Sequence, residues 1–178
     1  HQAVGDSHSW EPRLIPQVNE RVSVTNIIHL VRNGIPNVHS LNSINSDLFN
    51  ANPLFKEQIS FYLDLFGGSC NTPWEYWCFW WSVNSKIPSW LEANLPDTKV
   101  EVCRLEDLTS DQSYLNNVLE ELAPGSTDQI GDLSGILSKN DDRDFTGNRT
   151  PLEIWATWSE TQRQDFLRIC GPAMEQYG

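Results

Sequence analysis

Two short apolar runs in the sequence predict β-strands. Residues 27–31 of the first run are almost all aliphatic, and the run extends back to Val22. In the second run, residues 99–105, apolar side chains stand between charged ones. A nearly continuous aliphatic run fits a strand covered on both faces, as in a parallel sheet. We therefore expect strands over residues 22–31 and 99–105.

Helical patterns follow the first strand. Apolar residues recur at helical spacing from Ile35 to Leu48, and Pro36 suits the first turn of such a helix. A shorter helix is expected around residues 55–66. The tryptophan-rich residues 74–81 are apolar nearly all round, which favours a helix buried on most sides. Part of this block could instead line a pocket for an apolar or sugar-like group.

Three capping-box patterns mark further helix starts, at Thr109–Gln112, Thr150–Glu153 and Ser159–Gln162. The polar residues 125–150 between them predict a long loop. Strands that alternate with helices indicate an α/β fold in which helices flank a parallel sheet. The sequence shows no linker between domains, so we expect a single domain over residues 1–178.

Composition narrows the classes of function. The net charge of −12 argues against a nucleic-acid binder, which needs a basic face. No run of 18 apolar residues exists, so no membrane span is predicted. Four cysteines without CxxC spacing argue against zinc and favour reduced thiols in a cytoplasmic protein. The chain starts at His1 and its only methionine is Met174, so we expect an N-terminal part to be missing.

One strand–turn–helix unit carries a candidate anion site. Arg32 ends the first strand, and Ser40 follows eight residues later in the helix. Ligands of open α/β sheets bind outside the carboxyl ends of the strands. A guanidinium, a hydroxyl and a helix N-terminus together suit a phosphate. The alternative is that Arg32 forms an ordinary surface ion pair.

The segment from Ile27 to Gly34, Ile-Ile-His-Leu-Val-Arg-Asn-Gly, followed by Ser40, resembles the 3′-phosphate-binding strand and helix of sulfotransferases that use 3′-phosphoadenosine 5′-phosphosulfate (PAPS). Residues 102–108 are similar to the Arg-Tyr-Glu-Asp-Leu segment of that family, with Leu105 in place of Tyr. Residues 146–155 and 166–178 resemble the closing segment of bacterial sulfotransferase-like proteins. These matches occur in the family's order along the chain.

The resemblance implies a set of site residues and a partial P-loop-NTPase-like sheet. Arg32 and Ser40 would bind the 3′-phosphate of PAPS or of its product PAP (adenosine 3′,5′-bisphosphate), together with basic and glycine-containing residues near the C-terminus: Arg143, Gly147, Asn148 and Arg149. The catalytic base would be His8, with Asp6 as the alternative, because imidazole near neutral pKa suits proton removal from a hydroxyl. His8 could equally be a solvated residue. His29 and His39 are interpreted as structural.

One part of the family pattern has no counterpart. The family's first strand ends in a glycine-rich loop with a basic residue, which holds the 5′-phosphosulfate. The nearest stretch, residues 67–72, has no Lys or Arg, and no aliphatic strand precedes it. We therefore expect the strand with that loop to be absent, and the chain alone to lack half of the cofactor site.

The sequence leaves two functions open. The first is transfer of a sulfuryl group from PAPS to a hydroxyl or amine of a small-molecule, sugar or peptide acceptor, without a metal, a membrane or a nucleic acid. The alternative is a degenerate, non-catalytic sulfotransferase-like domain that binds an anionic ligand or a protein partner. A kinase-like member of the P-loop superfamily is disfavoured, because nothing replaces the Mg²⁺-binding residues that kinases need. The oligomeric state cannot be read from the sequence.

Overall fold

The computed structural model describes residues 15–21, 23–45, 53–122, 124–125 and 149–177. The chain divides into two compact units, and each unit combines two separated segments. The first unit is His1–Val31 with Ile87–Asn140, and the second is Arg32–Lys86 with Asp141–Gly178. The expectation of a single domain over residues 1–178 stays a prediction.

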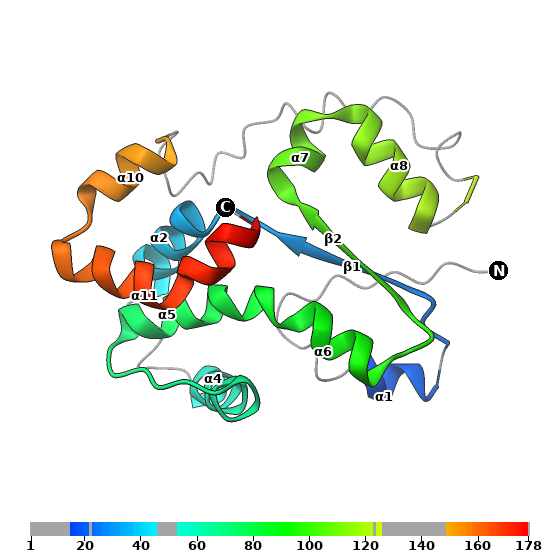
Figure 1. Cartoon of the computed structure of the whole chain (residues 1–178), viewed down its shortest axis with the longest axis horizontal. Helices are drawn as coiled ribbons and strands as arrows, with labels where there is room; N and C mark the ends of the chain where they lie inside the picture. Colours follow the sequence, from blue (N-terminus) through cyan, green and yellow to red (C-terminus); the bar gives the residue numbers. More distant parts are fainter. Residues whose placement is uncertain (1–14, 22, 46–52, 123, 126–148, 178) are drawn as a thin grey trace. The chain divides into compact units, whose positions relative to one another are not determined.

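The first unit contains a parallel pair of strands, β1 (Asn26–Val31) and β2 (Lys99–Arg104). Figure 1 shows the two strands side by side. Their register runs from Asn26 opposite Lys99 to Val31 opposite Arg104. Parallel strands need a connection that crosses back over the sheet. The residues between β1 and β2 provide it, because they return the chain to the end of the sheet at which β1 begins. The predicted parallel sheet is therefore confirmed, as a two-stranded sheet among the described residues.

The first strand starts at Asn26, later than the expected start at Val22. The backbone just before it is engaged elsewhere, since Val24 N donates to Asn19 Oδ1 at 2.7 Å. The carbonyl of Val24 also accepts a hydrogen bond of 2.7 Å from Thr98 Oγ1. These contacts use groups that a longer ladder would need. Helix α1 (Ile15–Asn19) lies upstream of this turn.

One helix precedes the second strand along the chain, and two helices follow it. Helix α6 (Ile87–Asn94) precedes it, and α7 (Leu105–Ser110) follows directly, so Leu105 belongs to a helix and not to the strand. Helix α8 (Gln112–Leu122) comes next. Its start is capped by Asp111, whose Oδ1 accepts from Ser113 N at 2.8 Å and from Tyr114 N at 3.1 Å.

The predicted capping box at Thr109–Gln112 is therefore wrong. Thr109 lies inside α7, where its hydroxyl donates to Leu105 O at 2.9 Å. A threonine in a helix interior bonds back to the preceding turn and does not cap the next helix.

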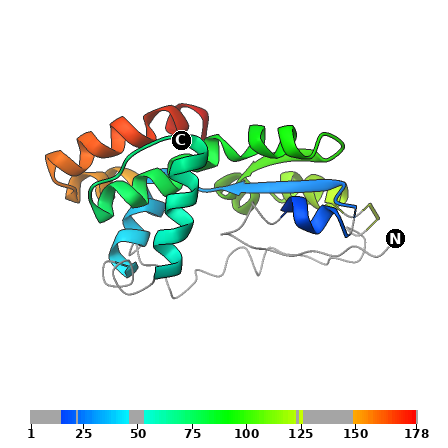
Figure 2. The same cartoon turned by 90° about the horizontal axis from the view of Figure 1, so that it is seen from below.

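The second unit is helical in its described part. Its helices are α2 (Gly34–Asn45), α4 (Pro53–Phe66), α5 (Pro73–Ser82), α10 (Pro151–Thr157) and α11 (Glu160–Tyr177), with a 3₁₀ turn at Val83–Ser85. In the turned view of Figure 2, α5 lies between α11 and α2. The capping boxes at Thr150–Glu153 and Ser159–Gln162 are both confirmed by their hydrogen bonds.

Aromatic side chains form the core of the second unit, as the pattern of residues 74–81 predicted. Trp77 and Trp81 of α5 are each 1% exposed. The ring of Phe166, on α11, stacks on Trp81 at 6.3 Å and meets the Trp158 ring at 5.1 Å. Large buried rings dominate the stability of such a core, because each removes a large apolar area from water.

Close packing at the start of α2 depends on Gly34. A Cβ atom at this position would lie 2.9 Å from the indole of Trp81 and from the sulfur of Met174. The helix therefore approaches α5 and α11 more closely than any other residue allows.

The described part of the chain is thus mixed α/β, mostly helical, with a small parallel sheet. The P-loop-NTPase-like arrangement and the missing loop-bearing strand stay predictions.

Among the described residues, no helix has both the length and the apolar character to cross a membrane. All four cysteines are free thiols, and three of them are buried: Cys78, Cys103 and Cys170.

Candidate phosphate-binding site

The backbone of Arg32 is anchored while its side chain is exposed. The carbonyl of Arg32 accepts a hydrogen bond of 2.8 Å from Nε1 of buried Trp81. The next residue, Asn33, caps α2, because its Oδ1 accepts from Ile35 N at 3.0 Å. The guanidinium of Arg32 forms no hydrogen bond or ion pair with any described residue. A fixed backbone with an unengaged cationic tip suits the binding of an anion from solvent.

Ser40 lies well inside α2. The helix begins at Gly34, two residues before Pro36, so Ser40 is almost two turns from the helix start. The helical rise places it about 9 Å along the axis from Gly34. Ser40 is half-buried. An extended Arg32 side chain that shares an anion with Ser40 therefore has to lie along the first turns of α2.

Arg149, predicted from the C-terminal motif, lies against the same helix. Its Nη2 atom is 2.9 Å from Nε2 of His39, the neighbour of Ser40. The backbone next to Arg149 is held by the capping box of α10, in which Thr150 N donates to Glu153 Oε2 at 2.7 Å. The fold thus brings Arg149 into contact with His39, the residue before Ser40 on α2, although 110 residues separate Arg149 and His39 along the chain.

His39 also contacts an indole. Trp158 Nε1 donates to His39 Nδ1 at 3.3 Å. Burial, and then the positive charge of Arg149, hold the pKa of His39 below its usual value. The interpretation of His39 as structural stays a prediction, and its contact with Arg149 was not expected from the sequence. The available signal was its position directly before Ser40.

Five predicted site residues lie outside the described residues. They are the candidate bases His8 and Asp6 and the C-terminal candidates Arg143, Gly147 and Asn148. Their roles stay predictions. The structure therefore relates three of the predicted residues to α2: Arg32 before its start, Ser40 within it and Arg149 against it. Arg32 and Arg149 carry guanidinium groups and Ser40 carries a hydroxyl, which are donor types that bind anions.

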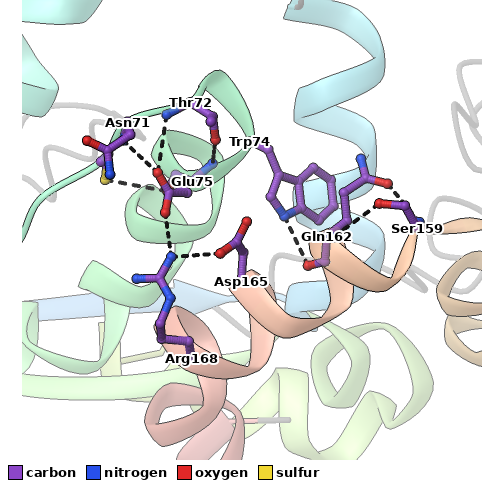
Figure 3. A network of polar contacts seen from close by, with 9 residues as sticks. Asn71, Thr72, Trp74, Glu75, Ser159, Gln162, Asp165 and Arg168 are labelled. Carbon is purple, nitrogen blue, oxygen red and sulfur yellow. Dashed lines mark hydrogen bonds and ion pairs between the residues drawn. The ribbon is translucent and has the colours of Figure 1, made fainter.

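The glycine-rich residues 67–72 are engaged internally. Figure 3 shows the Glu75 carboxylate at the start of α5, where Oε2 accepts from Asn71 N at 2.6 Å and from Thr72 N at 3.2 Å. The other oxygen of Glu75 pairs with Arg168, which also contacts Asp165 at 2.8 Å. Burial opposes ionisation of Glu75, but these donors outweigh it and lower its pKa. The chain's own carboxylate thus occupies the amides of Asn71 and Thr72.

Two other polar features are more ordinary. Lys99 forms an exposed ion-pair cluster with Glu101 and Glu121 beside a shallow surface depression. Within the described ranges, no group of three His, Cys, Asp or Glu side chains is arranged to hold a metal ion.

No protein-family model, curated protein or solved structure matches the chain at a significant level.

Proposed function

We propose that this chain is the 3′-phosphate-binding part of a sulfotransferase-like protein, which transfers a sulfuryl group from PAPS to a hydroxyl or amine of a small-molecule, sugar or peptide acceptor in the cytoplasm. The observation that carries the proposal is the contact of Arg149 with His39, which directly precedes Ser40 on α2. Two motifs from distant parts of the chain were each assigned to the same phosphate on sequence grounds. Arg149 of the second motif contacts His39 in the helix of the first motif, which supports that shared assignment.

Each residue has a defined part in the proposed reaction. Arg32, Ser40 and Arg149 hold the 3′-phosphate and so position the nucleotide. The acceptor oxygen or nitrogen attacks sulfur and forms an S–O or S–N bond, while the bond from sulfur to the 5′-phosphate oxygen breaks. The departing electron pair stays on PAP, and the base, His8 or Asp6, takes the acceptor proton. Positioning supplies much of the rate enhancement in such in-line transfers.

Calorimetric titration of the chain with PAP tests the phosphate site. We expect Arg32→Ala to weaken PAP binding by roughly 10- to 100-fold, because a charge-assisted hydrogen bond is worth about 1.5–3 kcal/mol. Ser40→Ala should weaken binding less, because it removes a neutral donor. Arg21→Met is the matched control, since it removes an exposed positive charge from the other unit. Equal PAP affinities for the Arg32 variant and the control would reject the proposal.

A second candidate, a non-catalytic domain that binds an anion or a partner, is favoured by one observation. In the described glycine-rich stretch, the amides of Asn71 and Thr72 are occupied by Glu75, which leaves fewer donors there for the 5′-phosphosulfate. An assay of sulfuryl transfer from PAPS separates the two candidates. PAP binding that depends on Arg32, without transfer to any tested phenol, sugar or tyrosine peptide, supports the non-catalytic domain.

A further inference from the structure

Two buried thiols meet between α5 and α11. Cys78, on α5, and Cys170, on α11, are both 0% exposed. The Sγ atom of Cys170 donates to the carbonyl oxygen of Cys78 at 3.2 Å, and a side-chain hydrogen bond also joins the two thiols. The residues are 92 positions apart in the sequence, so the packing of the two helices brings them into contact.

The surroundings of this pair favour neutral sulfur atoms. Trp77 and Trp81, on the same helix as Cys78, and Phe166, one turn before Cys170, are each 1% exposed. Burial, and then the neighbouring Cys78 thiol, raise the pKa of Cys170 well above its usual value. A disulfide brings no charge into such a core, whereas metal binding needs thiolates and, for zinc, two further ligands. Within the described residues, no group of three His, Cys, Asp or Glu side chains supplies a metal site.

We propose that Cys78 and Cys170 are a redox-sensitive pair, which closes into a disulfide between α5 and α11 when the chain reacts with a small disulfide such as oxidised glutathione. The thiolate of one cysteine attacks the small disulfide, so a mixed disulfide forms and one small thiol leaves. The second cysteine then attacks the mixed disulfide, and the second small thiol leaves. The two cysteines are oxidised and the small disulfide is reduced to two thiols. This inference does not depend on the proposed function.

Burial controls the rate of this exchange. The thiolate is the nucleophile, and a thiol in apolar surroundings rarely ionises, so α11 has to separate from α5 before either cysteine reacts. Cys70, the half-buried thiol, is no better as an entry point. Its Sγ donates to Glu75 O at 3.6 Å, and burial followed by the charge of Glu75 raises the pKa of Cys70 to about 12. Oxidation of the folded chain should therefore be slow and should accelerate in mild urea.

Peptide mapping by mass spectrometry tests the pairing. The reduced whole chain is equilibrated with mixtures of reduced and oxidised glutathione, in buffer and in unfolding urea, and is also refolded from urea in the same mixtures. We expect the folded chain to hold an intramolecular Cys78–Cys170 disulfide. The unfolded chain should favour Cys70–Cys78, because the shorter loop closes at a lower cost in entropy.

Refolding removes the barrier that burial sets, so its outcome decides the proposal. A refolded chain in which Cys78 and Cys170 stay reduced in the most oxidising mixture overturns it. A folded chain that pairs Cys70 with Cys78 overturns it too, because the pairing would then follow loop length and not the contact between α5 and α11.

Two variants are matched controls. Cys103→Ser removes a buried thiol of the other unit, and Cys70→Ser removes the half-buried thiol. Both should still form the Cys78–Cys170 disulfide, whereas Cys170→Ser should form no disulfide through Cys78 when folded. If Cys170→Ser fails to fold, the wild type and the two controls still decide the pairing.

Stability gives an independent readout. A disulfide that closes so long a loop restricts the unfolded chain, so oxidation should lower the equilibrium constant of unfolding roughly 30- to 1000-fold. Urea unfolding of the oxidised and reduced chains measures this change, and added reductant should reverse it. Cys103→Ser should show the same gain. An oxidised chain that is no more stable than the reduced chain means that the helices distort to make the bond, and it overturns the inference that the fold holds the pair ready for closure.

Discussion

At the residue scale, Gly34 shows how one missing side chain sets the position of the candidate site. The start of α2 packs against Trp81, and Trp81 also binds the carbonyl of Arg32. The same indole therefore fixes the approach of the helix and the backbone of the candidate anion ligand. Any displacement at Gly34 moves both.

Gly34→Ala should destabilise the second unit by about 1–3 kcal/mol, because the added Cβ forces apart a filled contact. Gly171→Ala is the matched control, since a Cβ there meets no heavy atom within 4 Å. Its effect should stay below about 1 kcal/mol. Urea unfolding monitored by tryptophan fluorescence measures both. Equal losses of stability in the two variants would contradict the packing argument.

Glu75 is a buried carboxylate whose pKa is lowered by its hydrogen bonds despite the opposing effect of burial. Its contribution to stability is therefore complete above the pKa of an unfolded glutamate, about 4.3. It is lost as the pH falls through the lower value of the folded state. We expect the free energy of unfolding to fall with acidification more steeply in the wild type than in Glu75→Gln.

Glu153→Gln is the control for this measurement. Glu153 belongs to a similar capping box at Thr150, but it is exposed, and among the described residues no arginine forms an ion pair with it as Arg168 does with Glu75, although the charge of Arg149 acts on it. The difference from wild type should be smaller for this variant than for Glu75→Gln. Urea unfolding at a series of pH values between 3 and 7 compares the three proteins, and indistinguishable slopes contradict the role assigned to Glu75.

At the element scale, the helix starts differ in how well local sequence predicts them. The boxes at Thr150 and Ser159 follow the expected pattern. The pattern at Thr109 failed because Asp111, two residues later, is a stronger cap and α7 already includes Thr109. A cap at Thr109 would start the helix earlier, because an N-cap accepts from amides two and three residues on, whereas the Asp111 carboxylate accepts from the amides of Ser113 and Tyr114.

Asp111→Ala should therefore cost about 1 kcal/mol of stability, the usual value for loss of a capping side chain. Thr109→Ala should change stability by less than about 0.5 kcal/mol, because its exposed hydroxyl bonds only within α7. Thermal unfolding of the two variants measures the difference. The reverse order of effects would restore the capping role of Thr109.

The positions of the two strands were predictable from their own residues. Residues 27–31 and 99–104 lie in the parallel pair that their aliphatic content indicated. The start of β1 was not predictable, because it depends on the bonds of Val24 to Asn19 and Thr98, which lie outside the strand pattern. The contact of Arg149 with His39 was likewise hidden, since no local rule relates residues so distant in the chain.

At the scale of the whole molecule, charge is the dominant property. The chain has 24 acidic and 12 basic residues, which leaves a net charge of −12. Like charges repel in the compact state, and dissolved salt screens that repulsion over about 10 Å at 0.1 M. The described ion pairs that involve Lys99 and Arg168 are partly exposed and contribute little in comparison.

We therefore expect the midpoint of thermal unfolding to rise as salt is added from about 0.02 to 0.5 M, as repulsion is screened. Scanning calorimetry in NaCl and in KCl measures the effect. Equal responses to the two salts indicate screening and not the binding of a particular cation. A midpoint that falls with salt would mean that ion pairs outweigh repulsion.

The interleaved order of the two units has a consequence for synthesis on the ribosome. The tryptophans of α5 emerge early, but Phe166 of α11, which stacks on Trp81, emerges near the end of the sequence. Until then a nascent chain carries a large apolar aromatic surface without its partner helix. Such surfaces attract chaperones and promote aggregation. Yield from a cell-free translation system should thus depend strongly on added chaperone, more than the stability of the finished fold suggests.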